Sequence, residues 1–454
     1  MYGQEPIVTD SVRIGMINIE GNRITKSRIV FRELAFKVNE YVKWSEVDYL
    51  KETSINNLTK TSLFNFVEIE IDNNSPGILI ITVKLIERWY IWPTLYLNHT
   101  DLNFAEWWRT KDLNKLEYGF GVKVNNFRGM KETLLLNIRL GNFTKYEIEY
   151  KGIHLDPTGR HLLSLKTAFS EQSYVPWGIE DNKLQNLKSN RTLLTSTDFA
   201  LKYVYRKAFF NSHSATFGYT DDRIADTIVN LNNNFFGLDS TRQKYLSLEY
   251  EFTRDTRDSK AYPKTGYFLL ASIRKTGLSL LPEEFKGADF RFQYSDYRKL
   301  SKRFYTATGF YFASNANNYK DFFSQTGLGY LNFVRGYEYY AVNGDEAILF
   351  KSLLKYELLP KKVVNLNFWP VRKAYQINKI PLEIYANVYF DAGYVNDRQG
   401  LYKINNNTLV NKLMYSAGAG IDFVTYYDKV LRFDYSFNAL GESGLFIHWK
   451  APIR

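Results

Sequence analysis

The chain of 454 residues is long enough for two or three ordinary domains, or for one small domain followed by a larger one. Its formal net charge is +11, but Lys and Arg are spread along the whole length without a dense basic run, which argues against nucleic acid as a partner. No stretch approaches the roughly 18 consecutive apolar residues of a transmembrane helix, although 17% of the residues are aromatic, which is unusually many.

The sequence lacks the cysteines, the serine elbow and the paired histidines that mark common enzyme sites. There is no cysteine, which excludes disulfide bonds and cysteine metal ligands. No Gly-x-Ser-x-Gly elbow occurs, and no histidine pair has the spacing of a zinc site. The five histidines are His99, His154, His161, His213 and His448. We therefore expect no enzyme activity, no catalytic residue, no metal site and no cofactor.

Residues 11–88 predict a small α/β domain in which one sheet is covered by two helices. The expected elements, in the order β-α-α-β-β, are a strand at 12–19, helices at about 25–34 and 45–61, and strands at 64–71 and 78–86. The strand at 64–71 alternates cleanly and includes Phe66, Val67 and Ile69. If this strand lies at an edge of the sheet, it could bind a client polypeptide by strand addition.

Residues 89–454 have a different pattern: short segments alternate polar and apolar residues and are rich in Tyr and Phe. Such alternation over about ten residues is typical of an outer-membrane β-barrel. The expected strands lie near 91–98, 116–124, 131–141, 145–153, 161–170, 193–206, 209–220, 243–255, 266–275, 288–299, 303–313, 347–359, 383–396, 413–425, 429–438 and 444–450. We therefore predict sixteen antiparallel strands.

The connections between these strands support the barrel, because mostly short turns alternate with often long loops. The longest loop is at about 314–346, and the gap at 360–382 is an exception, because it is long where a short turn is expected. The alternative is a large soluble β protein such as a propeller. A propeller should show a repeat of roughly 40–50 residues, which this sequence lacks.

The segment Glu383–Gly393 indicates which strand face looks inward. Glu383, Asp391 and the tyrosines between them share one face, whereas the other face is apolar. Carboxylates in hydrocarbon would cost several kcal/mol, so the first face should line the lumen. The next strand places Asp422 on an inward face with small residues, which leaves space along the wall. Both aspartates predict a cationic partner from a loop.

Several short motifs resemble those of the outer-membrane barrel assembly superfamily, which includes BamA-like insertases and two-partner secretion transporters. The motifs are Val334-Arg335-Gly336-Tyr337, Tyr389-Phe390-Asp391-Ala392-Gly393, Thr253–Asp258 with Tyr262–Gly266, and, in the N-terminal domain, Glu20-Gly21-Asn22 and Ser62-Leu63-Phe64. They occur in the family's order over nearly the whole chain. The resemblance implies a 16-stranded transmembrane barrel preceded by one α/β polypeptide-transport-associated (POTRA) domain, which makes this a short member of the superfamily.

The resemblance also implies a lumenal latch, in which the sixth extracellular loop folds into the barrel and Arg335 pairs with Asp391. A guanidinium can bind a carboxylate with two parallel hydrogen bonds, as Lys cannot. Gly336 permits a close approach or positive φ, and Tyr337 adds packing area. Val334 and Gly393 complete the expected latch. Without the resemblance, Arg335 would be interpreted as an ordinary solvated loop residue.

The first and last strands predict a weak seam. Pro93 lies in the first strand and has no N–H to donate, and the short last strand begins at Gly444, which can kink. Unpaired edges can template the pairing of an incoming strand. The alternative is an ordinary barrel closure with slightly fewer hydrogen bonds.

These features predict a protein of the bacterial outer membrane, with its N-terminal domain in the periplasm, that inserts or translocates polypeptides. A polypeptide secretion transporter and a passive outer-membrane channel are the alternatives. The expected partners are unfolded or nascent outer-membrane or secreted polypeptides, outer-membrane lipid, and accessory periplasmic or surface proteins. The start of the chain lacks the basic and apolar regions of a signal peptide, which fits either a cytoplasmic protein or a mature start after signal removal.

Overall fold

The computed structural model describes residues 11–75, 77–99, 116–207, 210–317, 321–365, 379–398, 400, 405–425, 429–448 and 453. Contacts divide the chain into two compact units. The first is built mainly from residues 11–92 together with 124–133, and the second holds most of the remaining chain. No helix of the described part is long and apolar enough to cross a membrane.

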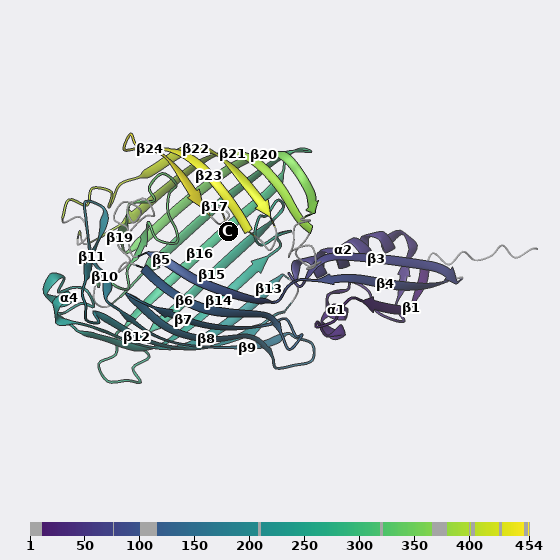
Figure 1. Cartoon of the computed structure of the whole chain (residues 1–454), viewed down its shortest axis with the longest axis horizontal. Coiled ribbons are helices and arrows are strands. Elements are labelled where there is room, and N and C mark those ends of the chain that lie inside the picture. The colour runs from purple at the N-terminus through teal and green to yellow at the C-terminus, as the bar shows by residue number, and fades with distance from the viewer. Residues whose placement is uncertain are drawn as a thin grey trace, which may run out of the picture. The chain divides into compact units, whose positions relative to one another are not determined.

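The first unit is a four-stranded sheet with two α-helices. Its elements are β1 (Ser11–Glu20), α1 (Ser27–Glu33), β2 (Tyr41–Lys43), the 3₁₀-helix η1 (Trp44–Glu46), α2 (Val47–Lys60), β3 (Phe64–Ser75) and β4 (Ile78–Glu87). The sheet order is β2-β1-β4-β3, with β1 and β4 parallel and the other pairs antiparallel. Figure 1 labels β1, β3, β4 and the two α-helices. The sequence-based prediction missed β2, because three residues are too few to show a period of two.

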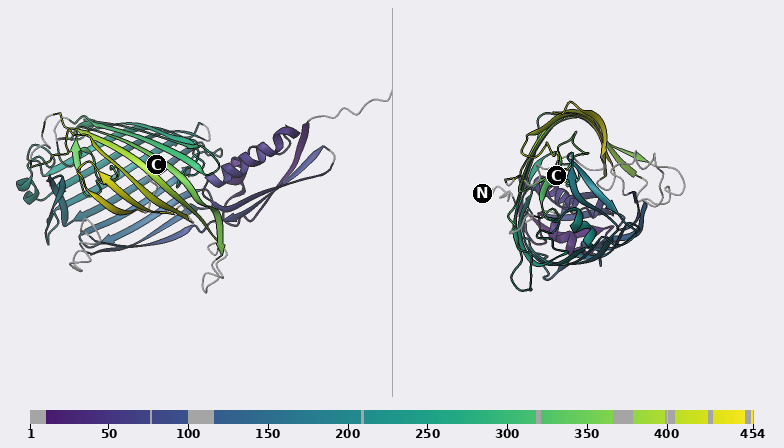
Figure 2. Two further views of the ribbon diagram at one scale, coloured as in Figure 1. Left: turned by 90° about the horizontal axis from the view of Figure 1, so that it is seen from above. Right: turned by 90° about the vertical axis from the view of Figure 1, so that its left-hand side faces the viewer.

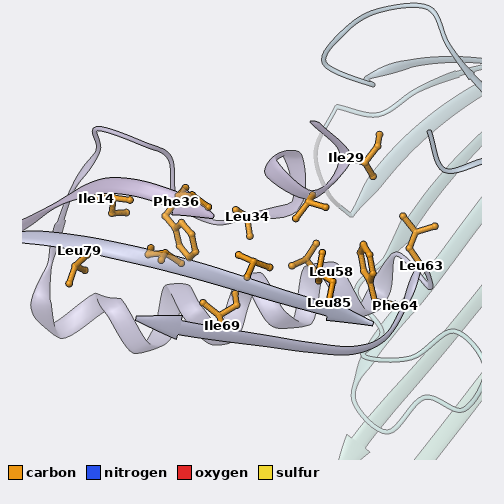
Figure 3. Packing of buried hydrophobic residues seen from close by; sticks show 14 of the residues in the cluster. Ile14, Ile29, Leu34, Phe36, Leu58, Leu63, Phe64, Ile69, Leu79 and Leu85 are labelled. Atoms are coloured by element: carbon orange, nitrogen blue, oxygen red, sulfur yellow. The ribbon is translucent and has the colours of Figure 1, made fainter. Parts of the chain in front are cut away.

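The core of the first unit lies between the sheet and the two helices. Ile14 and Leu79 come from the two central strands, Ile29 from α1 and Leu58 from α2, and each is at most 2% exposed (Figure 3). Burying such side chains stabilises the domain by about 1.5–3 kcal/mol each. The alternating strand β3 contributes Ile69 to the same core.

The second unit is one antiparallel sheet of sixteen strands, which curves into a barrel (Figure 2). The strands, in sheet order, are β5 (Ile91–His99), β6 (Leu116–Phe127), β7 (Glu132–Leu140), β8 (Phe143–His154), β9 (His161–Gln172), β12 (Leu194–Tyr205), β13 (Asn211–Ile224), β14 (Arg242–Asp255), β15 (Gly266–Thr276), β16 (Gly287–Lys299), β17 (Phe304–Asn315), β20 (Glu346–Asn365), β21 (Lys379–Asn396), β22 (Met414–Thr425), β23 (Lys429–Asn438) and β24 (Ser443–His448). The predicted sixteen-stranded barrel is confirmed.

The gap predicted at 360–382 is shorter than expected, because β20 and β21 extend into it from both sides. β20 continues to Asn365 and β21 begins at Lys379. Residues 366–378, between them, lie outside the described part of the chain.

The side chains of the barrel strands alternate between a buried inner face and an exposed outer face. In β21, Tyr385 and Asp391 are 0% exposed, whereas Val388 and Phe390 are 54% and 45% exposed. The carboxylates therefore point inward and the apolar side chains outward, as the sequence predicts.

The long loops contain short elements that were not predicted. They are the hairpin β10 (Tyr174–Glu180) and β11 (Lys183–Lys188), the helix α4 (Asp226–Leu231), and the paired strands β18 (Thr326–Leu328) and β19 (Val342–Gly344). Because consecutive barrel strands are antiparallel, these elements all lie at the same end of the barrel. The two-residue turn of the hairpin is Asp181-Asn182, and both residues have the positive φ that such turns require.

Candidate functional site

The candidate site is centred on the tip of the loop between β17 and β20. Residues Val334–Tyr337 form a tight turn, in which the N–H of Tyr337 donates to the carbonyl of Val334 at 3.0 Å. Gly336 has a φ of 84°, which favours glycine. The Arg335 side chain is only 1% exposed. The loop tip is therefore inside the protein and not in solvent.

Arg335 binds Asp391 of β21 with two parallel hydrogen bonds. Its Nε donates to Oδ2 at 2.8 Å and its Nη2 donates to Oδ1 at 2.6 Å, and the Arg335 backbone N–H donates to Oδ2 at 3.2 Å. The Lys351 ammonium lies 3.9 Å from the same carboxylate. A fully buried carboxylate would be strongly disfavoured without such partners, so the pair holds the loop on the wall.

A tyrosine of the same strand supports the guanidinium. The central carbon of Arg335 lies 3.6 Å from the ring centroid of Tyr389, which allows a cation–π interaction. The Tyr389 ring occupies the space beside Gly418, where an added Cβ would lie 2.5 Å from Cζ of the ring. The small inward face of β22 was expected to leave space for a loop. At Gly418 that space is filled by Tyr389 from the neighbouring strand.

Two glycines let the loop approach the wall closely. A Cβ on Gly336 would lie 3.2 Å from Cβ of Ser436 in β23, and the Gly336 carbonyl accepts a hydrogen bond from Asn438 at 2.8 Å. A Cβ on Gly393 of β21 would lie 2.5 Å from Cγ2 of Val334. The structure thus places Val334, Gly336 and Gly393 together, in addition to the Arg335–Asp391 pair.

Tyr337 fixes the far side of the turn. Its side chain is 3% exposed, and its hydroxyl oxygen accepts a hydrogen bond from the N–H of Ala439, just after β23, at 3.2 Å. The ring packs in an apolar cluster with Leu328, Val334 and Val395. All six residues predicted for the latch therefore lie at one place in the structure.

The same loop also contacts the last strand, β24, which sequence reasoning did not predict. The rings of Tyr339 and Phe446 are 5.7 Å apart, and Phe333 stacks on His448 at 5.6 Å. Glu338 Oε1 lies 3.4 Å from Nε2 of His448. The alternation of β24 directs Phe446 and His448 inward, but nothing in the sequence shows what they meet.

The predicted seam residues lie in the two strands that end the sheet order. Pro93 is in β5, and Gly444 is in β24 (Figure 1). Gly444 pairs with Ser436 in a regular register and has no positive φ, so no kink occurs there. Ile453 is buried against the inward-facing Tyr389 and Leu353, so the chain lies inside the barrel at this residue.

The predicted client-binding strand, β3, is at an edge of its sheet. Ile69 is 1% exposed and Val67 packs partly buried on the same core, so these side chains are not available to a client. Phe66 lies on the opposite face of the strand and is half-buried. Only the backbone edge of β3 could therefore pair with an added strand.

The long loops at one end of the barrel are joined by the tip of the β10–β11 hairpin. The N–H of Asn182 donates to Asn407 Oδ1 at 2.8 Å, and Asn182 Oδ1 accepts from the N–H of Leu409 at 2.9 Å. The Asn182 carbonyl accepts from the N–H of Ala341 at 2.9 Å. One asparagine thus ties together three loops that are far apart in the sequence.

The fold and the loop inside it define a class of protein: a sixteen-stranded antiparallel barrel whose lumen holds one of its own loops. No family model matches the chain, and no curated protein matches its sequence. Among solved structures, it is similar to BamA from Haemophilus ducreyi lacking POTRA domains 1-3, with a TM-score of 0.53 and 16% identity over 96% of this chain and 83% of that chain. It is also similar to CdiB from Escherichia coli, with a TM-score of 0.55 and 13% identity over 96% of this chain and 75% of that chain. The chain therefore has the same fold as these two barrels.

Proposed function

We propose that this chain is a barrel of the bacterial outer membrane, with its N-terminal domain in the periplasm, that inserts or translocates polypeptides. The outer faces of the strands support the membrane location. On the last two strands, Phe437, Leu445 and Ile447 are 57%, 63% and 56% exposed. A belt of exposed apolar side chains around a barrel is stable in hydrocarbon and unfavourable in water.

The observation that carries the proposal is that one loop binds both the wall and the terminal strand. Arg335 is paired with Asp391 of β21, and four residues later Tyr339 contacts Phe446 of β24. Movement of the loop would therefore change the contacts that hold β24, which is one of the two strands at the seam. β24 has only six residues, and β5 contains Pro93, so few hydrogen bonds can join these two strands. A seam of this kind could open and pair with an incoming strand.

A passive channel would not need these features. A loop held in the lumen by a bidentate ion pair narrows the path along the barrel axis. Between insertion at the seam and secretion through the barrel, the contacts of the loop with β24 favour insertion. Both functions would act on unfolded or nascent outer-membrane or secreted polypeptides, with outer-membrane lipid around the seam.

In this proposal the α/β unit is a single POTRA domain that receives clients and accessory proteins. In the described part of the chain, β3 is the last strand of its sheet, so a client strand could be added along its outer edge. Photo-crosslinking residues at Glu68 and Glu70, on the outer face of β3, should capture clients in cells. The same residue placed at Glu52, on helix α2, is the control, and equal capture from both elements would contradict strand addition.

Cysteine cross-linking tests the seam, and a chain without native cysteine is well suited to it. Outward-facing residues of β5, such as Leu95, would each be paired with outward-facing residues of β24, such as Leu445, and the pair that forms a disulfide in cells would be used. The matched control joins Tyr435 to Leu445, which are already paired between β23 and β24. If insertion uses the seam, the first disulfide should block assembly of client barrels until it is reduced, and the control disulfide should not. Normal assembly with a fully closed seam would refute the proposal.

Replacing Arg335 tests the loop independently. Arg335→Ala should leave the barrel folded, free the loop and impair client assembly in a strain that depends on this chain. Arg335→Lys keeps the charge but loses the two parallel hydrogen bonds, so it should rescue only in part. Full activity of Arg335→Ala at normal protein levels would contradict a role for the latch.

A further inference from the structure

The turn between β14 and β15 reaches into the barrel from the end opposite to the Arg335 loop. It carries Tyr262, which is 2% exposed, and the Tyr262 hydroxyl donates to Oδ2 of Asp422 at 2.6 Å. Asp422 is in β22, and four strands stand between β15 and β22 in the sheet. A contact across this many strands requires that the turn crosses the end of the barrel.

The Tyr262 ring has a built pocket on the inner wall. It lies 5.0 Å from the ring of Tyr385, and the Lys355 ammonium lies 3.8 Å from its centroid. Lys355 also donates to the carbonyl of Pro263 at 3.3 Å, and Lys264 forms an ion pair with Glu383 at 2.8 Å. The turn is therefore bound to β20, β21 and β22 by successive residues.

The turn is internally rigid, which suits a structural element better than a mobile loop. Asp258 Oδ1 accepts hydrogen bonds from the backbone N–H groups of Ser259, Lys264 and Thr265, at 2.9, 2.9 and 3.2 Å. Gly266 has a φ of 90°, which a residue with a side chain would adopt only with strain. These hydrogen bonds hold the turn in the conformation that places Tyr262 against the wall.

The acceptor of Tyr262 is held in place on the wall. Asp422 is 0% exposed, and its Oδ1 lies 3.5 Å from Nε of Arg432 in β23. Asp422 and Asp391, which binds the Arg335 loop, are on the adjacent strands β22 and β21. Each wall aspartate thus binds a connection that enters from a different end of the barrel.

We propose that the β14–β15 turn is a second lumenal latch, that is, a connection held inside the barrel by its inner wall. Tyr262 of the turn donates the hydrogen bond that holds it, and Asp422 of the wall accepts this bond. This latch closes the end of the barrel where the turn lies, independently of the Arg335 loop. Its expected effect is to keep the lumen impermeable to small ions while the barrel remains folded. The inference concerns permeability and does not depend on polypeptide insertion.

Planar bilayer recordings of the purified full chain test this directly. Tyr262→Phe removes only the hydroxyl, and Tyr262→Ala removes the ring as well. Loss of a hydrogen bond to a buried charged group should raise the occurrence of conducting openings roughly tenfold in Tyr262→Phe. Tyr262→Ala should raise it further. Tyr305→Phe is the matched control, because Tyr305 belongs to the same apolar cluster.

Folding is checked by the shift in gel mobility on heating, which folded barrels show. Tyr262→Phe retains the packed ring, so its conductance alone tests the proposal if Tyr262→Ala does not fold. Wild-type conductance in folded Tyr262→Phe would overturn the proposal, as would an equal increase in Tyr305→Phe. If the latches are independent, the increases caused by Tyr262→Phe and Arg335→Ala should multiply in the double variant. No increase beyond Arg335→Ala alone would overturn the independence of the second latch.

Discussion

The central carbon of the Arg335 guanidinium lies over the Tyr389 ring, 3.6 Å from its centroid. The same ring fills the space beside Gly418 in the next strand. The position of the ring that supports Arg335 therefore depends on the absence of a side chain at Gly418. This relationship can be tested without changing any polar group of the site.

We expect Gly418→Ala to weaken the loop through Tyr389. The added methyl group would overlap both the backbone carbonyl oxygen of Tyr435 in β23 and the phenol group of Tyr389. Such overpacking costs about 1–3 kcal/mol of the free energy of unfolding. Urea unfolding of the refolded barrel measures this loss, and limited proteolysis detects release of the loop. Ala419→Val, on the exposed face of the same strand, is the control. Equal loop cleavage in both variants would show that Tyr389 does not transmit the change.

The Arg335–Asp391 pair should show strong energetic coupling in a double-mutant cycle. Arg335→Met or Asp391→Asn alone leaves a buried partner uncompensated, which costs about 3–5 kcal/mol. The double variant should lose less than the sum of the two, with a coupling of about 1–3 kcal/mol. Arg242→Met with Asp221→Asn is the matched control, because this pair has the same forked geometry but a 42% exposed arginine. A coupling no larger than in this exposed pair would mean that burial does not strengthen the latch.

Gly393 and Val334 should be complementary in size. Gly393→Ala places a methyl group against Val334, so we expect a loss of about 1–3 kcal/mol in the free energy of unfolding. Val334→Ala removes the opposing methyl groups and should restore much of this loss when combined with Gly393→Ala. Thermal unfolding followed by circular dichroism measures each variant. Simple addition of the two losses would indicate that the residues do not pack against each other.

In the first unit, Glu87 should protect the backbone N–H groups of Ile24 and Thr25 from hydrogen exchange. Its carboxylate accepts hydrogen bonds from the N–H groups of Thr25 at 2.7 Å and Ile24 at 3.1 Å. Glu87→Ala leaves both donors without this acceptor, so amide exchange at these positions should accelerate on the order of tenfold or more. Hydrogen exchange followed by mass spectrometry of the full chain measures this. Glu68→Ala, on the outer face of the same sheet, is the control, and similar acceleration there would contradict a specific role.

The inward and outward faces of the barrel strands could be predicted from the sequence, because ionised carboxylates are excluded from hydrocarbon. Asp391 and Glu383 cannot face hydrocarbon, and the period of two in β21 then assigns every other side chain of the strand. The strands were also long enough to be recognised individually. By contrast, the three-residue strand β2 and the short helix α4 are fixed by tertiary contacts and have too few residues for a periodic signal.

The contacts inside the lumen were less predictable. Arg335 was assigned to Asp391 through the resemblance, since the residues alone favoured a solvated arginine. Asp422 was expected to bind a cation from a loop, but it binds Tyr262 from a turn and lies beside Arg432 of the neighbouring strand. Tyr262 and Asp422 are 160 residues apart in the sequence, and only the curvature of the barrel brings them together.

The single asparagine at the tip of the β10–β11 hairpin bears on the direction in which a client could leave. Asn182 is hydrogen bonded to Asn407, Leu409 and Ala341, which belong to two other loops at the same end of the barrel. If the chain inserts polypeptides as proposed, a client that travels along the barrel axis would have to separate these loops, whereas a client that leaves sideways between β24 and β5 would not disturb Asn182. Under that proposal, the hydrogen bonds of Asn182 disfavour exit along the axis and leave the lateral route free of this constraint.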